Sequence, residues 1–184
     1  MRVGAVVLAA GASRRLGEPK QLVMLGSETL LERAVRIARE AECSPIVVVL
    51  GDEAASIHTA CDLGSAIVVV NVDWADGMGG SIGVGIGALG DIDACVVMTC
   101  DMPAVTAAHL CSLMASGEVT ASSYAGRRGV PAYFPVRTFP SLMELHGDAG
   151  ARDMLRSAPC VQLMGGELDV DTIEDLERAR ELFG

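Results

Sequence analysis

The sequence predicts an α/β fold, a three-layer αβα sandwich around a mostly parallel sheet. Short segments rich in valine and isoleucine alternate with segments of helical spacing along the whole chain, and the first of the apolar segments show no polar–apolar alternation. Strands that are apolar on both faces are typical of parallel sheets covered by helices on each side. The 184 residues contain no long linker, internal repeat or low-complexity tract beyond one glycine-rich stretch, so we expect one domain, residues 1–184.

The first part of the chain predicts four strands with helices between them. The clearest helix is Glu28–Glu42, because its apolar residues recur at the three- and four-residue spacing of one helix face. The strands are expected at Val3–Leu8, Pro45–Leu50, Ala66–Asn71 and Ala94–Thr99. The helices are expected at Glu28–Glu42, Asp52–Cys61, Ser81–Leu89 and Thr106–Ala115.

The second part predicts shorter elements. Strands are expected at Val119–Tyr124, Val130–Pro135 and Cys160–Met164, and helices at Thr138–Leu145, Ala149–Arg156 and Thr172–Leu182. Ligands of open parallel sheets bind at the carboxyl ends of the strands. We therefore expect the chemistry to lie just after Leu8, Leu50, Asn71 and Thr99.

Composition excludes several classes of protein. The longest apolar run, Ala5–Ala10, is far shorter than the ~20 residues of a spanning helix, which argues against a membrane protein. Arg2 and the apolar residues after it have the outline of a secretory signal, but Gly4 and Gly11 interrupt them, and we interpret the segment as a buried strand. The net charge of −10 and the 3% of aromatic residues argue against nucleic-acid binding.

The cysteines indicate a reducing compartment. Six are present, none forms a C-x-x-C pair, and most lie inside apolar segments. Free thiols explain this pattern better than a disulfide framework or a zinc site. We therefore predict a cytoplasmic protein.

The charges are unevenly distributed along the chain. From Glu40 to Gly126 there are eleven acidic residues and no lysine or arginine, and Lys20 is the only lysine of the protein. Positive residues collect in two groups, Arg14, Arg15 and Lys20 near the start, and Arg127, Arg128, Arg137, Arg152 and Arg156 later. Because the overall field repels anions, we expect an anionic substrate to be held by these two patches or through a metal ion.

The loop after the first strand, residues 8–20, carries the most information. Its small residues allow backbone N–H groups to approach a phosphate or a base, and Lys20 ends it with a point charge. The Walker motif does not fit, because five residues separate Gly11 from Gly17 and Lys20 is displaced. A G-x-G-x-x-G pattern occurs at Gly85–Gly90, but it precedes a strand instead of following one, and we predict that it binds no dinucleotide.

This loop resembles the L-A-A-G-x-S-x-R-x-G-x-x-K signature of the nucleotidyltransferases related to molybdenum cofactor cytidylyltransferase. It matches at Leu8, Ala9, Ala10, Gly11, Ser13, Arg15, Gly17 and Lys20. Further motifs follow in order: Gly77-Met78 with Ser81, Asp101-Met102-Pro103, Arg128-Gly129 with Pro131, Gly147–Arg152, and Asp169–Thr172 with Glu174-Asp175-Leu176. The resemblance covers essentially the whole chain and implies a Rossmann-like nucleotidyltransferase sheet.

The resemblance also implies a reaction, the transfer of CMP from CTP to the terminal phosphate of molybdenum-bound molybdopterin with release of pyrophosphate. Lys20, Arg15 and Asp101 are its implied catalytic residues. The implied nucleotide site consists of Leu8, Ala9, Ala10, Gly11, Ser13, Arg15, Lys20 and Ser81. Asp101 and Asp171 would bind Mg²⁺, with Asp169 as the less favoured alternative to Asp171. Arg128, Asp148 and Arg152 would contact the acceptor, and a molybdoenzyme or its maturation chaperone would be the protein partner.

Each assignment has a plainer alternative. In the plainer interpretation, Ser13 only caps the loop and Asp101 only starts a turn. Asp171 would only lie near the N-terminus of a helix, where its negative charge is favourable. Asp148 and Arg152 could likewise form a helix-start pair that holds the fold.

Departures from the family pattern concern the acceptor more than the nucleotide. Met102 stands where glutamine is frequent, Val130 where asparagine or histidine is common, and Gly79-Gly80 where serines are usual. A sugar- or polyol-phosphate nucleotidyltransferase is therefore a second interpretation, and a non-catalytic molybdenum cofactor-binding chaperone a third. The presence of Lys20, Asp101 and Asp171 together favours an enzyme.

Overall fold

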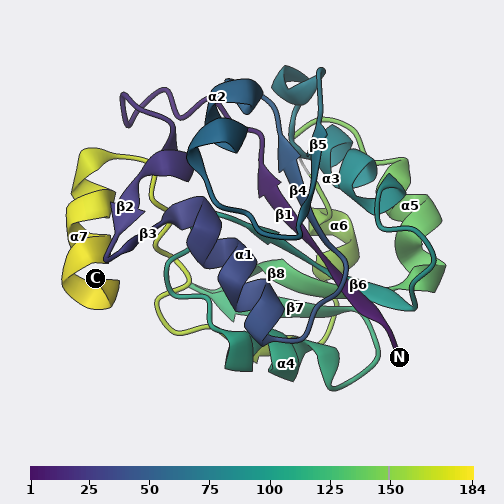
Figure 1. Cartoon of the computed structure of the whole chain (residues 1–184). Helices are drawn as coiled ribbons and strands as arrows, with labels where there is room; N and C mark the ends of the chain where they lie inside the picture. Colours follow the sequence, from purple (N-terminus) through teal and green to yellow (C-terminus); the bar gives the residue numbers. More distant parts are fainter. Residues whose placement is uncertain (149) are drawn as a thin grey trace.

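The protein is built around a seven-stranded sheet, described here from a computed structural model that covers residues 1–148 and 150–184 (Figure 1). The strands are β1 (Val3–Ala9), β4 (Ile46–Leu50), β5 (Ile67–Val70), β6 (Ala94–Thr99), β7 (Thr120–Tyr124), β8 (Arg127–Pro135) and β9 (Cys160–Gln162). Their order across the sheet is β5-β4-β1-β6-β8-β7-β9. Ala149, the expected first residue of a helix and a member of the Gly147–Arg152 motif, lies outside the described residues.

The sheet is mostly parallel, as the sequence predicts. Strand β8 is the antiparallel one, running against both β6 and β7, and the other neighbours run in the same direction. The turn between β7 and β8 consists of Ala125 and Gly126, which both have positive φ, at 47° and 73°. Two such residues match the twist of a tight hairpin, and this turn reverses the chain within the sheet.

Helices cover both faces of the sheet. One face carries α1 (Leu30–Glu40), α2 (Ala54–Ala60) and α4 (Ala107–Met114), and the other carries α3 (Met78–Gly87), α5 (Phe139–Met143) and α6 (Arg152–Leu155). Successive strand residues alternate between the two cores, so that Val7 packs on the first face and Val6 on the second. The predicted αβα sandwich is therefore confirmed.

The start of the first helix differs from the prediction. Glu28–Thr29, expected inside that helix, form strand β3, which pairs with β2 (Met24–Leu25). Thr29 is the N-cap of α1 and forms a reciprocal capping box with Glu32, which fixes the first helical residue at Leu30. The small hairpin packs on α7 (Ile173–Phe183), and the two lie side by side in Figure 1.

Other element ends differ from the prediction by a few residues, and three short 3₁₀ segments were not predicted. These segments are Lys20–Leu22 (η1), Trp74–Asp76 (η2) and Val136–Thr138 (η3). The late strand β9 ends at Gln162 instead of Met164, and α6 begins at Arg152.

The glycines of α3 serve packing. A Cβ on Gly85 would lie 2.4 Å from a methyl carbon of Val6, so the helix approaches the sheet more closely than a larger residue allows. This residue opens the G-x-G-x-x-G pattern, which lies within and just after a helix instead of between a strand and a helix. The pattern is therefore not in the position of a dinucleotide-binding loop.

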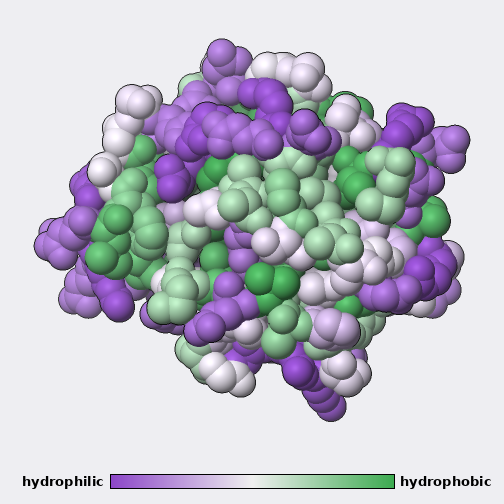
Figure 2. All heavy atoms as spheres, turned by 90° about the horizontal axis from the view of Figure 1, so that it is seen from below, coloured by the Kyte–Doolittle hydropathy of each residue, from purple (hydrophilic) through white to green (hydrophobic). Residues whose placement is uncertain are grey.

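The chain has a mean hydropathy of +0.40, and some of its hydrophobic residues lie on the surface. Seen from below, the side on which α4 lies, hydrophobic residues gather in the middle of the surface and hydrophilic residues surround them (Figure 2). Within the described residues, no helix combines the length and apolar character that crossing a membrane requires.

A buried polar network lies between α4 and the β7–β8 hairpin. The Ser122 hydroxyl donates to the carbonyl of Pro131, so the Nε2–H of His109, 2.7 Å away, donates to Ser122. Burial lowers the pKa of His109, because the charged imidazolium loses its water here.

We predict that this histidine makes stability depend on pH. The unfolded chain takes up a proton near the ordinary pKa of about 6.5, whereas the native chain does so only at lower pH. The neutral His109 therefore makes its full contribution to the free energy of unfolding above about pH 6.5, and this contribution is lost as the pH falls toward the pKa of the native state. Urea unfolding at pH 7.5 and at pH 5.5 should show a larger loss for the wild type than for His109→Gln. The exposed His58 provides the control, His58→Gln, which should behave as the wild type does; equal losses in all three proteins would contradict the prediction.

Candidate active site

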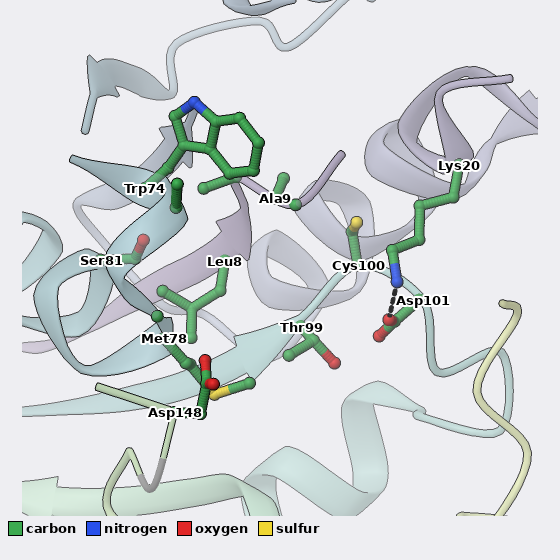
Figure 3. A pocket seen from close by; sticks show the side chains of 14 residues that line it. Leu8, Ala9, Lys20, Trp74, Met78, Ser81, Thr99, Cys100, Asp101 and Asp148 are labelled. Carbon is green, nitrogen blue, oxygen red and sulfur yellow. Dashed lines mark hydrogen bonds and ion pairs between the residues drawn. The ribbon is translucent and has the colours of Figure 1, made fainter. Parts of the chain in front are cut away.

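The ends of β1 and β6 place two predicted site segments side by side. These strands are parallel neighbours, so the loop after β1 and the residues after Thr99 meet at one edge of the sheet. A cavity of about 330 Å³, the first cavity, opens there (Figure 3). It is lined by Leu8, Ala9, Ala10, Gly11, Lys20, Trp74, Ala75, Gly77, Met78, Ser81, Thr99, Cys100, Asp101 and Asp148.

Gln21 holds the loop after β1 from behind. Its side chain is fully buried, and its Nε2 donates to the carbonyls of Ala9 at 2.6 Å and Gly11 at 3.1 Å. Its Oε1 has no hydrogen-bond partner among the described residues. The amide thus fixes both ends of the segment that lines the cavity.

Two backbone hydrogen bonds complete this support. The N–H of Cys100 donates to Leu8, and the N–H of Asp52 donates to Ala10, each at 3.2 Å. The N–H groups of residues 11–12 make no hydrogen bond within the described chain. The loop is therefore held through its carbonyls, and its amide donors remain available to a ligand.

Lys20 lies between two carboxylates that come from distant parts of the chain. Its Nζ is 2.6 Å from Oδ2 of Asp101 and 2.8 Å from Oδ1 of Asp171. Burial lowers the pKa of Lys20, but the negative charge of Asp101 and the hydrogen bonds to both carboxylates outweigh it, so the net direction is upward. The N–H of Val170 donates to the carbonyl of Asp101 at 2.9 Å and fixes the two segments to each other.

Arg15 and Ser13 lie at the edge of this arrangement. Arg15 contacts Asp171 at 2.8 Å through a largely exposed side chain, and Ser13 accepts the N–H of Lys20 at 2.9 Å. Neither residue lines the first cavity. The Ser13 hydroxyl thus contacts the backbone of its own loop, and Arg15 pairs with Asp171.

Asp171 is not the cap of α7. That position belongs to Thr172, whose hydroxyl accepts the N–H of Asp175 in a capping box. The Asp171 carboxylate instead points to the lysine of the first loop. Asp171 therefore lies directly before the cap of α7, as the plainer interpretation expects, and its carboxylate in addition contacts Lys20.

A second cavity of about 340 Å³ adjoins the first. Lys20, Met78, Thr99, Asp101 and Asp148 line both, and we call this set the junction. The second cavity is also lined by Ile82, Met102, Tyr124, Arg127, Arg128, Gly129, Val130, Ala151, Arg152, Leu155, Asp169 and Asp171. The structure thus brings together Arg128, Asp148 and Arg152, the three residues expected at the acceptor, and no ion pair joins Asp148 to Arg152 within the described residues.

Negative charge accumulates around the junction. Burial, followed by the charge of Asp101, raises the pKa of Asp169 to about 6, although Arg127 acts in the opposite direction. Asp169 lines the second cavity and is not a contact of Lys20, whereas Asp171 is. The pair closest to a common cation is therefore Asp101 and Asp171.

These two carboxylates fit a hard divalent cation. Each places an oxygen within 2.8 Å of one cationic nitrogen, so a cation between them is within reach of both. Within the described residues, no group of three or more histidine, cysteine, aspartate or glutamate side chains has the arrangement of a metal site. Mg²⁺ binds through one or two carboxylates and keeps several waters, whereas a structural zinc site needs more protein ligands.

The structure adds residues that sequence reasoning did not single out. Trp74 lies across the first cavity from Asp148 and Met78 (Figure 3). It is the only tryptophan of a chain with 3% aromatic residues and follows the third predicted strand, and this position was the available signal. Cys100 is buried, and burial raises the pKa of its thiol to about 12, as expected for an inert core cysteine.

Comparison with known proteins identifies the family. The family model described as the MobA-like NTP transferase domain matches residues 5–163. The chain belongs to this family. Family membership confirms the nucleotidyltransferase resemblance that the sequence motifs indicate.

Several curated relatives match this MobA-like chain over almost its full length. Nicotine blue oxidoreductase of Paenarthrobacter nicotinovorans is 33% identical, covering 96% of this chain and 95% of that protein. Purine catabolism protein PucB of Bacillus subtilis is 30% identical, covering 95% and 94%. Molybdenum cofactor cytidylyltransferase of Escherichia coli is 24% identical, covering 98% and 97%.

Solved structures show the same fold. Rv0371c of Mycobacterium tuberculosis is 32% identical with a TM-score of 0.87, over 98% of both chains. A complex of Rv0371C with manganese is 29% identical with a TM-score of 0.80, over 99% of this chain and 100% of that one. The β1 loop, the junction and the second cavity thus lie in a MobA-like framework.

We predict that Gln21→Leu loosens the β1 loop. The substitution leaves the buried carbonyl of Ala9 without its donor, which costs about 1–3 kcal/mol. Nucleotide affinity should fall about tenfold, because the loop amides lose their fixed direction. Urea unfolding and equilibrium binding of nucleoside triphosphates measure the two effects. Gln162→Leu, on the exposed end of β9, is the matched control and should leave both unchanged.

Proposed function

We propose that this protein is a Mg²⁺-dependent cytidylyltransferase that transfers CMP from CTP to the terminal phosphate of a molybdopterin-type acceptor. The observation that carries the proposal is the pair of cavities that meet at Lys20 and Asp101. A nucleotide in the first cavity and an acceptor in the second would bring their phosphates together at the junction. Phosphoryl-type transfer needs mainly this positioning, together with neutralisation of charge.

The first cavity suits a nucleotide. The N–H groups of residues 11–12 have no partner within the described residues and can donate to a polar ligand. Lys20 would supply a cation for the triphosphate, and Arg15 lies beyond Asp171 at the rim. Trp74 offers an aromatic surface to a base. Ser81, whose hydroxyl accepts the Asn71 amide at 3.0 Å, would contact the nucleotide from α3.

Asp101 and Asp171 would hold Mg²⁺, and the complex of the relative Rv0371C with manganese supports the binding of a divalent cation. When bound, the ion supplies positive charge to the phosphate oxygens of the nucleotide. Lys20 would then exchange its carboxylate contacts for phosphate contacts. The ion would balance the charge of the carboxylates, and Lys20 would balance part of the charge of the phosphates.

The second cavity suits an anionic acceptor. Arg128 and Arg152 supply guanidinium groups, and Asp148 supplies a carboxylate that accepts hydrogen bonds from an amino or amide group. The similarity to molybdenum cofactor cytidylyltransferase supports a molybdopterin-type acceptor. The product would pass to a molybdoenzyme or its maturation chaperone, and we propose a cytoplasmic location, supported by six free cysteines.

The similarity to nicotine blue oxidoreductase supports a second candidate, an oxidoreductase activity. The two candidates differ in their products. Release of pyrophosphate that depends on both CTP and a phosphate acceptor supports the transferase. Protein-dependent reduction of a dye by an added reductant, in the absence of any nucleoside triphosphate, supports the oxidoreductase.

We predict that Asp101→Asn abolishes transfer while the protein stays folded. The amide keeps the size of the side chain but removes the charge that a divalent cation requires, and Lys20 keeps Asp171 as its partner. Activity should fall at least about 100-fold, which corresponds to about 2.7 kcal/mol in the transition state. Pyrophosphate release with increasing Mg²⁺ measures the effect, and Asp91→Asn, an exposed position that lines neither cavity, is the control. Full wild-type turnover in excess EDTA would overturn the metal proposal.

We predict that CTP is preferred over GTP and that Ala10 contributes to the preference. Related guanylyltransferases have Leu-Ala-Gly-Gly where this chain has Leu8-Ala9-Ala10-Gly11, so the methyl group of Ala10 narrows the cavity against a purine. A contact of this size corresponds to about a 10–200-fold preference. Competition between CTP and GTP at equal concentration should show this for the wild type and a smaller ratio for Ala10→Gly. A wild type that favours GTP would overturn the cytidylyl assignment.

A further inference from the structure

Four arginines line a groove on the outer side of the second cavity. The groove has a volume of about 820 Å³ and is lined by Ser123, Gly126, Arg127, Arg128, Arg152, Arg156 and Cys160. We call it the arginine groove. Three of its arginines, Arg127, Arg128 and Arg152, also line the second cavity, so the groove continues that cavity away from the junction.

The groove keeps a positive charge in a protein whose net charge is −10. Two carboxylates lie near its guanidinium groups: Asp169 is 3.9 Å from Arg127, and Asp153 is 2.8 Å from Arg156. The second pair is about 80% exposed on both sides, and exposed pairs contribute at most about 1 kcal/mol. Like charges that converge without compensation repel one another, and an anion between them removes that cost.

Two of the four arginines, Arg127 and Arg128, are held in place before any ligand arrives. The guanidinium of Arg128 donates to the backbone carbonyl of Arg156 at 2.5 Å, and that of Arg127 lies 5.1 Å from the ring centre of Tyr124. A preorganised arginine loses less side-chain entropy when it binds an oxyanion. The same surroundings act on Cys160, because the adjacent Arg128 lowers the pKa of its thiol.

We propose that the arginine groove binds a second oxyanion group of the acceptor, at the end opposite to the phosphate that reacts. An acceptor with a single phosphate would place that phosphate at the junction and leave the groove without a ligand. A groove continuous with the second cavity therefore fits an acceptor with anionic groups at both ends. That the oxyanion belongs to an acceptor rests on the proposed function, whereas the binding of oxyanions in the groove does not.

Cys160 provides a direct test, because it lies in the groove and is exposed. The test uses full-length protein with Cys111→Ser, since Cys111 is the other exposed cysteine. The rate of alkylation of Cys160 by iodoacetamide, a neutral reagent, is measured with inorganic phosphate, with molybdate, or with chloride at equal ionic strength. Phosphate or molybdate should slow the reaction at least threefold and saturably at millimolar concentration, while chloride should not.

The variant Arg156→Gln, which changes the groove but not the second cavity, should lose this protection, and Arg178→Gln on α7 should retain it. Stronger protection by molybdate supports a metal oxyanion as the distal group, and equal or stronger protection by phosphate supports a phosphate ester. The proposal would be overturned if chloride slowed the alkylation of Cys160 as much as phosphate and molybdate do. It would also be overturned if these oxyanions protected Cys160 fully in Arg156→Gln. The readout needs neither nucleotide nor turnover, so a protein that binds oxyanions here but transfers no CMP contradicts the transferase proposal alone.

Discussion

The ammonium group of Lys20, held between the carboxylates of Asp101 and Asp171, is the interaction on which the rest of the site depends. It joins the loop after the first strand, the end of the central strand β6 and the segment before the last helix. Without a cation at this point, two partly buried carboxylates would face each other without compensation, and such an arrangement is costly where water is partly excluded. A site that must contain a cation to stay assembled is also suited to receive one together with an anionic ligand. The only lysine of the chain thus serves both the resting structure and the chemistry that we propose.

The charges follow from the same requirement. The overall charge of −10 gives the protein no general attraction for phosphates, so binding has to come from local groups. The loop amides and Lys20 serve the first cavity, and the guanidinium groups of Arg128 and Arg152 serve the second. An acidic surface around two local cationic regions favours ligands that present their anionic groups at the right spacing over polyanions in general. This selectivity is set by geometry, because the long-range field opposes every anion and only the local groups can reward a particular spacing of charges.

The sequence predicts the layers, the strands and the order of the site segments well, because these depend on local periodicity and on where apolar segments end. The strand Val3–Leu8 and the position of Asp101 after Thr99 follow directly from that pattern. The hairpin that contains Glu28 was missed, because its two-residue strands are too short to show a period and are stabilised by packing on α7. Trp74 and Gln21 were missed for a related reason. Their roles come from tertiary contacts, a cavity wall and two backbone carbonyls, which no spacing in the chain encodes.

The contact between Lys20 and Asp171 joins residues that are 151 positions apart in the chain. Contacts of such separation form late in folding, because the entropy of closing a long loop must be overcome before the contact can contribute. The central strands can pair and bury their side chains while the last segment is still unattached, and the loop lysine then has Asp101 as its carboxylate partner. The site is therefore complete only when the last helix docks on the small hairpin. Partly folded chains would have most of the core and none of the finished cation site, and the competence to bind a metal would mark the final step of folding.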